Sequence, residues 1–346
     1  MFTDTEISPW KTPEGRAKYM AAYDATLALW PVPYEELDVH TRFGTTHIIA
    51  SGPQEAPPLV LLHALSFSAT MWFPNVGELS RNFRVYAVDR LNDTGKSVPS
   101  HPLRSRAECA EWVVEVFNAL HLAQADVAGL SQGGWFTLNV ALYAPDRVKR
   151  LVLLNPSAFV PLSIGFYLAS FPGFLWPIHP LLHRALYTFF VKGFVVNERF
   201  AEQFMLGLKH FTLPKLPPLP TVFSEGELHQ RVFHFLSVKL QTVLPTVFSD
   251  EELRRLTTPT LLLLGEQDTA MNEQAAFNRA RRLIPHLEAE MFPKAGHILS
   301  MEQPEIVDAR ILKFLGQGQE PEAVPHDYNG CVRGSRSNWT KTNVKL

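Results

Sequence analysis

The sequence has only two cysteines, Cys109 and Cys331, among 346 residues. Two cysteines cannot form a disulfide framework, and their spacing matches no metal site. Cys109 falls in a stretch with helical periodicity, whereas Cys331 falls in a polar tail. We therefore expect one buried thiol, one exposed thiol and no metal centre.

An excess of one charge is also absent. The chain carries 32 Lys and Arg against 34 Asp and Glu, and 46% of its residues are hydrophobic. A nucleic-acid partner would require a concentrated basic surface, so we expect none. The apolar content suffices for a large core, built either as one α/β domain or as a domain with an insertion. A small molecule is the expected substrate.

The N-terminus lacks the basic start and apolar run of a signal peptide, which predicts a cytoplasmic protein. Residues 151–183 contain no Asp, Glu, Lys or Arg and are long enough to be a membrane-span candidate. Prolines divide this stretch into short pieces, which favours a strand followed by buried helical turns. We expect neither a membrane span nor contact with a membrane surface. The prolines are Pro156, Pro161, Pro172, Pro177 and Pro180.

Short apolar runs without alternation indicate strands that are covered on both faces. Segments with helical periodicity lie between these runs, and this repeat predicts an α/β fold with a mostly parallel sheet flanked by helices. In such a sheet the functional residues gather at the carboxyl ends of the strands. The expected strands are 59–63, 85–88, 126–130, 151–154, 260–264 and 289–292; the expected helices are 106–122, 133–143 and 304–315.

Composition divides the chain into four parts. Residues 1–38 are expected to form an N-terminal helical arm, since apolar residues recur at helical spacing until Pro31. The α/β core comprises residues 39–158 and 257–316 and begins with an edge hairpin at 39–51, whose turn is expected at 43–46. Residues 159–256 interrupt the repeat with many Phe, Leu and Pro residues and are predicted to be an inserted helical cap. The polar tail, 317–346, is predicted to be disordered.

Gly129-Leu130-Ser131-Gln132-Gly133 follows an apolar run and opens a helical pattern. A G-x-S-x-G turn between a strand and a helix is typical of a nucleophilic serine, whose hydroxyl projects from the edge of the sheet. A serine that only caps a helix would explain Ser131 but not the glycines around it. We therefore predict that Ser131 is a catalytic nucleophile.

A serine hydroxyl needs a general base, and that base needs a group to orient it. His297 follows the last expected strand, directly after Gly296, and Asp268 lies in the loop after the strand at 260–264. Alternatively, Asp268 could cap a helix and His297 could lie on a surface loop. We predict that His297 is the base and Asp268 the orienting acid, with Glu266 as the second candidate for the acid.

Acyl transfer places negative charge on the former carbonyl oxygen, and backbone N–H groups can stabilise that charge. The residue after the nucleophile, Gln132, supplies one such group. The second should come from the loop after the strand at 59–63, where Leu65 is the expected donor. We predict that the Leu65 and Gln132 amides form an oxyanion hole.

Five segments, taken in their order along the chain, resemble those of an α/β-hydrolase of the bacterial carboxylesterase type. They are Leu-Leu-His63, the loop from Asp89 to Ser97, Gly-Leu-Ser131-Gln-Gly-Gly, Gly-Glu-Gln-Asp268 and Ala-Gly-His297. The resemblance spans residues 39–316. It implies an eight-stranded sheet, no cofactor and hydrolysis through an acyl-enzyme.

Two positions depart from the family pattern. His63 is followed by Ala64 instead of glycine, and Asn92 stands in a loop that is usually rich in glycine. If position 64 requires a positive φ, alanine would strain the oxyanion loop. Asn92 is the milder change, because asparagine tolerates the left-handed region.

The phenylalanine-rich cap predicts an apolar substrate pocket, although each of these side chains could simply pack the cap onto the core. The residues expected to line it are Phe159, Phe171, Phe174 and Trp176. The sequence thus predicts a serine hydrolase that cleaves a carboxylic ester of a largely apolar small molecule. Three alternatives remain: the same three residues could serve acyl transfer, thioester release or cyclisation; the fold could only bind a ligand; or the apolar stretch near residues 159–174 could attach to a membrane surface.

Overall fold

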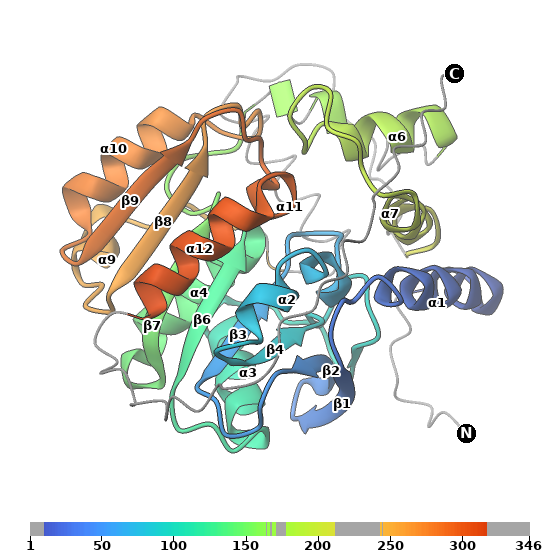
Figure 1. The fold of residues 1–346 in the computed structure, drawn as a ribbon, viewed down its shortest axis with the longest axis horizontal. Helices are drawn as coiled ribbons and strands as arrows, with labels where there is room; N and C mark the ends of the chain where they lie inside the picture. The colour runs from blue at the N-terminus through green and yellow to red at the C-terminus, as the bar shows by residue number, and fades with distance from the viewer. Residues whose placement is uncertain are drawn as a thin grey trace, which may run out of the picture. The chain divides into compact units, whose positions relative to one another are not determined.

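The structure is a computed structural model that describes residues 10–163, 165–166, 168–170, 178–211, 243 and 245–316. The chain divides into two compact units, Met1–Leu315 and Gly316–Leu346. All described helices and strands belong to the first unit (Figure 1). Among them, no helix is long and apolar enough to cross a membrane.

A nine-stranded sheet forms the centre of the first unit, with the order β1-β2-β4-β3-β6-β7-β8-β9 and with β5 paired to β2. The five pairs from β4-β3 to β8-β9 are parallel, and the β1-β2, β2-β4 and β2-β5 pairs are antiparallel. The predicted mostly parallel α/β sheet is therefore confirmed. One strand more than the expected eight is present, because β5 has two residues and leaves no periodic pattern in the sequence. The strands are β1 (Tyr34–Thr41), β2 (Gly44–Ser51), β3 (Pro58–Leu62), β4 (Arg84–Val88), β5 (Val98–Pro99), β6 (Ala125–Leu130), β7 (Val148–Leu154), β8 (Thr260–Gly265) and β9 (Leu287–Phe292).

Alternate residues of the central strands enter two separate hydrophobic clusters, as side chains that point to opposite faces of a sheet must. Leu61 belongs to one cluster and Leu62 to the other. Helices α1 (Pro13–Leu27), α2 (Val76–Leu79), α11 (Leu299–Glu302) and α12 (Pro304–Leu315) contribute to the cluster of Leu61, and α3 (Arg106–Ala119), α4 (Gln132–Tyr143), α9 (Asp250–Arg254) and α10 (Glu273–Leu283) to that of Leu62. Cys109 lies in α3 and is buried, as expected; Cys331 lies outside the described residues.

The hairpin at the edge of the sheet is present, but its turn lies two residues earlier than expected. Thr41 pairs with Gly44, so Arg42 and Phe43 form the turn. Gly44 has a φ of 139°, and a Cβ atom there would lie 2.3 Å from the carbonyl oxygen of Val98. Glycine thus begins the second strand instead of forming the turn. The first strand starts at Tyr34, within the stretch assigned to the arm.

Helix α1 begins as its sequence indicates. The Thr12 hydroxyl accepts a hydrogen bond from the Gly15 N–H, and Pro13 occupies the first turn, where no donor is needed. In Figure 1 the helix lies beside α7 (Glu198–His210). The Lys11 N–H donates to the His210 carbonyl at 2.9 Å, and Trp10 forms a β-bridge with Phe211. The N-terminal segment is therefore held on the segment predicted to be the cap.

The two ends of the predicted cap meet at the core. Strands β7 and β8 precede and follow it and are parallel neighbours. The Phe248 N–H donates to the Ala158 carbonyl at 3.0 Å. The Arg279 guanidinium, from α10, donates to the carbonyls of both Phe159 and Phe248. Helices α6 (His179–Tyr187) and α7 lie between these ends in the sequence, and α9 follows Phe248 within the range predicted to be the cap.

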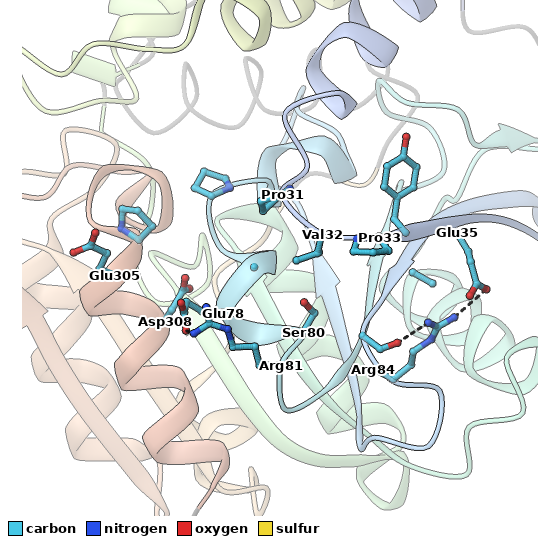
Figure 2. A pocket seen from close by; sticks show the side chains of 16 residues that line it. Pro31, Val32, Pro33, Glu35, Glu78, Ser80, Arg81, Arg84, Glu305 and Asp308 are labelled. Atoms are coloured by element: carbon cyan, nitrogen blue, oxygen red, sulfur yellow. Dashed lines mark hydrogen bonds and ion pairs between the residues drawn. The ribbon is translucent and has the colours of Figure 1, made fainter. Parts of the chain in front are cut away.

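A groove of about 920 Å³ lies away from the predicted site and is lined by residues of α2, α12 and the start of β1 (Figure 2). Asp308 of α12 lines it but is only 1% exposed. The Asn75 side-chain amide donates to this carboxyl at 2.8 Å. Burial raises the pKa of the Asp308 carboxyl to about 8, and the nearby Glu78 adds to the effect. We therefore expect the carboxyl to be protonated at neutral pH in the folded protein.

Asp308→Asn is expected to raise Tm by several degrees at pH 8.5 and by much less at pH 5. The folded protein binds the proton more tightly than the unfolded chain, whose carboxyl keeps its ordinary pKa of 3.8. The wild-type free energy of unfolding therefore falls as pH rises from about 4 to about 8, and asparagine removes this dependence. Thermal unfolding at both pH values measures the effect, with Glu305→Gln in the same groove as the control. An equal shift at both pH values would contradict the prediction.

Candidate active site

Ser131 lies between β6 and α4 with a φ of 55° and a ψ of −116°, a conformation that non-glycine residues rarely adopt. Neighbouring backbone leaves no room for a side chain at Gly129 or Gly133. A Cβ atom on Gly133 would lie 2.0 Å from the Leu62 carbonyl oxygen, and one on Gly129 would lie 2.4 Å from the Gly133 carbonyl. These glycines thus allow the sharp strand-to-helix turn that projects the Ser131 hydroxyl from the sheet edge.

Ser131, His297 and Asp268 form one continuous chain of hydrogen bonds. The His297 imidazole lies 2.8 Å from the Ser131 hydroxyl through Nε2 and 2.7 Å from the Asp268 carboxylate through Nδ1. All three side chains are buried. Because a carboxylate only accepts hydrogen bonds, Nδ1 carries the proton and Nε2 accepts one from the serine.

The loop after β8 places the Asp268 carboxylate beside the histidine. One carboxylate oxygen accepts from the Ala270 N–H at 2.7 Å, and the other faces His297. A Cβ atom on Gly265 would lie 2.3 Å from the Gly296 carbonyl oxygen, so this glycine lets the two loops approach. Glu266, the second candidate for the acid, has an exposed side chain and makes no described contact with His297. The structure therefore brings Asp268, and not Glu266, to His297.

Two backbone N–H groups close to Ser131 in the chain or in space make no described hydrogen bond. They are those of Leu65 and Gln132, which have no acceptor among the described residues. The Leu62 and His63 carbonyl oxygens would lie within 2.7 Å of a Cβ atom on Gly133, which brings the loop after β3 against the first turn of α4. Both backbone N–H groups thus lie near Ser131 and are available to a ligand oxygen.

The loop after β3 is held by buried polar side chains. His63 Nε2 accepts from the Arg90 N–H at 2.9 Å, so its Nδ1 donates to the Ala64 carbonyl at 2.8 Å. Burial lowers the pKa of the His63 imidazole well below its usual value, and Arg90 adds to the effect. The Asp93 carboxylate accepts from the Ser66 N–H at 3.0 Å.

The residue with a positive φ in the loop after β3 is Ser66 and not Ala64. Ser66 has a φ of 64°, whereas Ala64 is not among the residues with positive φ. Alanine at position 64 is therefore unstrained. Asn92 does have a positive φ, 61°, in agreement with the tolerance expected of asparagine.

Among the described residues, the aromatic rings of Phe166 and Phe189 lie beside His297. The ring centroids of Phe166 and Phe189 lie 6.3 and 5.9 Å from that of His297. Phe159 is buried in the hydrophobic cluster that contains Leu62, together with Phe248. The other expected pocket residues, Phe171, Phe174 and Trp176, lie outside the described residues. Aromatic side chains from the segment predicted to be the cap thus lie beside His297, and the expectation for Phe171, Phe174 and Trp176 stays a prediction.

Ser157 is a polar neighbour of the site that the sequence analysis did not single out. Its hydroxyl lies 3.3 Å from the Ser131 hydroxyl, and its N–H donates to the Ser131 carbonyl at 3.2 Å. Since Ser157 follows β7, the strand beside β6, its place at a carboxyl end was the available signal.

A model of the alpha/beta hydrolase family matches residues 59–310. The chain belongs to this family. Carboxylesterase YbfK of Bacillus subtilis is 39% identical to the hydrolase over 306 residues, which make up 88% of this chain and 96% of that protein.

A second relative, the uncharacterized carboxylesterase nap of Bacillus subtilis, is 36% identical over 86% of this hydrolase and 92% of its own length. The crystal structure of naproxen esterase from the same organism matches with a TM-score of 0.76 at 36% identity, and covers 88% of this chain and 99% of that one. The predicted resemblance to bacterial carboxylesterases is therefore confirmed.

Proposed function

We propose that this hydrolase is a serine carboxylesterase, with Ser131 as nucleophile, His297 as general base and Asp268 as the acid that orients the histidine. The observation that carries the proposal is the continuous hydrogen-bond path from Asp268 through His297 to Ser131. The similarity to carboxylesterases over most of the chain supports ester hydrolysis as the reaction.

The proposed reaction has two steps. His297 Nε2 removes the Ser131 proton while the serine oxygen attacks the ester carbonyl, and the imidazolium then returns the proton to the departing alcohol. Water next attacks the acyl-enzyme, gives its proton to His297 and releases the acid together with the free Ser131 hydroxyl. The Leu65 and Gln132 N–H groups hold the oxyanion in both steps. No cofactor takes part in this chemistry.

We further propose that the acyl group is apolar and carries an aromatic ring. Phe166 and Phe189 pack beside His297, and Phe67 packs against Phe189 with ring centroids 5.6 Å apart. An aromatic wall next to the base favours a ligand with a matching face. The relative called naproxen esterase is in keeping with this substrate class.

Fluorophosphonate labelling followed by peptide mass spectrometry tests the proposal, with turnover of a p-nitrophenyl ester of an arylalkanoic acid measured in parallel. We expect one label on Ser131 in the wild type, none in Ser131→Ala and almost none in His297→Ala. Labelling of Ser131 without ester turnover would instead indicate acyl transfer, thioester release or cyclisation. A folded wild-type protein that does not label would indicate a ligand-binding protein.

A further inference from the structure

The side chain of Asn155 joins the two loops that carry Asp268 and His297. Asn155 follows β7 and is fully buried. Its Nδ2 group donates to the carbonyls of Gly296 and His297, both at 2.8 Å. Its Oδ1 atom accepts from the Gly265 N–H at 2.9 Å, at the end of the strand that leads to Asp268. One side chain from a third strand thus binds the backbone on both sides of the acid–base pair.

The chemistry of this position suits asparagine. A side-chain amide offers two N–H donors and one carbonyl acceptor. Here the two donors meet two backbone carbonyls, and the acceptor meets one backbone N–H. An aspartate of the same shape would turn a carboxylate toward two carbonyl oxygens. Asn155 also has a φ of 38°, and asparagine is one of the few residues with a side chain that enter the left-handed region readily.

Apart from the hydrogen bond between Asp268 and His297, the other described hydrogen bonds between these loops stop short of the histidine. The Glu266 N–H donates to the Phe292 carbonyl and the Gln267 N–H to the Ala295 carbonyl. The His297 N–H donates to Phe189, in the segment predicted to be the cap. Asn155 is therefore the described contact that fixes the carbonyls of Gly296 and His297 relative to β8, inside the core.

We propose that Asn155 is a positioning residue that sets the distance and angle between the Asp268 carboxylate and the His297 imidazole. The proposal rests on the function proposed above. A displacement of about 1 Å in a catalytic group can cost about 10²-fold in rate. Among the described residues, Asn155 alone donates a hydrogen bond to the His297 carbonyl. Asn155 acts on the reaction through His297 and does not touch the substrate.

Asn155→Gly tests the proposal, because glycine accepts the positive φ and removes only the amide. We expect kcat to fall about 10- to 100-fold with KM nearly unchanged, and the downfield Nδ1–H proton resonance of His297 to disappear or broaden. Asn139→Ala is the matched control. Asn139 is a buried asparagine that exchanges two hydrogen bonds with Arg106, far along α4 from Ser131, and its loss should lower Tm without changing kcat or the resonance.

The outcomes separate this proposal from the one on which it rests. If wild-type Ser131 labels and Asn155→Gly retains both its kcat and the His297 resonance, Asn155 is only a structural residue. If the wild type does not label, the proposed function is wrong, and the resonance still reports whether Asn155 orients His297. Should Asn155→Gly not fold, Asn155→Ser serves in its place, since a single hydroxyl cannot make all three hydrogen bonds of the amide, and it is expected to show the same loss.

Discussion

Alanine in place of Ser131 or of His297 is expected to lower kcat for ester hydrolysis by about 10⁵- to 10⁶-fold, with the fold unchanged. Without the hydroxyl there is no attacking atom, and without the imidazole the hydroxyl keeps its proton. Burst and steady-state assays with a p-nitrophenyl ester measure the loss, and circular dichroism verifies the fold. The exposed residues Ser100 and His286 provide control variants, S100A and H286A, whose rates should match the wild type.

The double variant, Ser131→Ala with His297→Ala, should be no slower than either single variant. Residues that act as one unit lose their effect together, so the two losses do not multiply. If the losses did multiply, the serine and the histidine would be acting independently, in conflict with the 2.8 Å hydrogen bond between them.

The second large effect is expected from Asp268→Asn, which should lower kcat by about 10⁴-fold. The new amide can donate a hydrogen bond to Nδ1 of His297, which moves the imidazole proton to Nε2, where it blocks acceptance of the serine proton. Ester turnover measured between pH 6 and pH 9 tests this. Glu266→Gln is the matched control, because Glu266 lies two residues earlier in the same loop and is exposed. Near wild-type turnover in Asp268→Asn, or a large loss in Glu266→Gln, would reject Asp268 as the orienting acid.

The elements of the core could be predicted because their signals are local. The closing helix was expected at 304–315, and α12 has those limits. The strand expected at 126–130 is β6, which begins one residue earlier. The glycines around Ser131 marked a turn with no room for side chains, and the structure has such a turn there. In each case the residues that determine the conformation are neighbours in sequence.

The remaining parts of the site depend on contacts between distant residues. Asn155 and Gly265 are 110 positions apart, and Asn155 and His297 are 142 positions apart. No periodic pattern near Asn155 indicates that its amide will meet backbone from two other strands. The burial of Asp308 has the same origin, since a single acid in an amphipathic helix has the same sequence pattern whether solvent or another element covers it.

The segment between β7 and β8 leaves and re-enters the core at neighbouring positions, so it can change without disturbing the sheet. A loop whose two ends are neighbours can change in length at small entropic cost, because each doubling of its length adds only about 0.6 kcal/mol. The Phe248 N–H donates to the Ala158 carbonyl, and the Arg279 guanidinium donates to a carbonyl at each end of the segment. These hydrogen bonds hold the two ends together. We expect sequence changes between these ends to leave the register of β7 and β8 unchanged. Members of the family can then differ in this segment while the positions of Ser131, Asp268 and His297 stay the same.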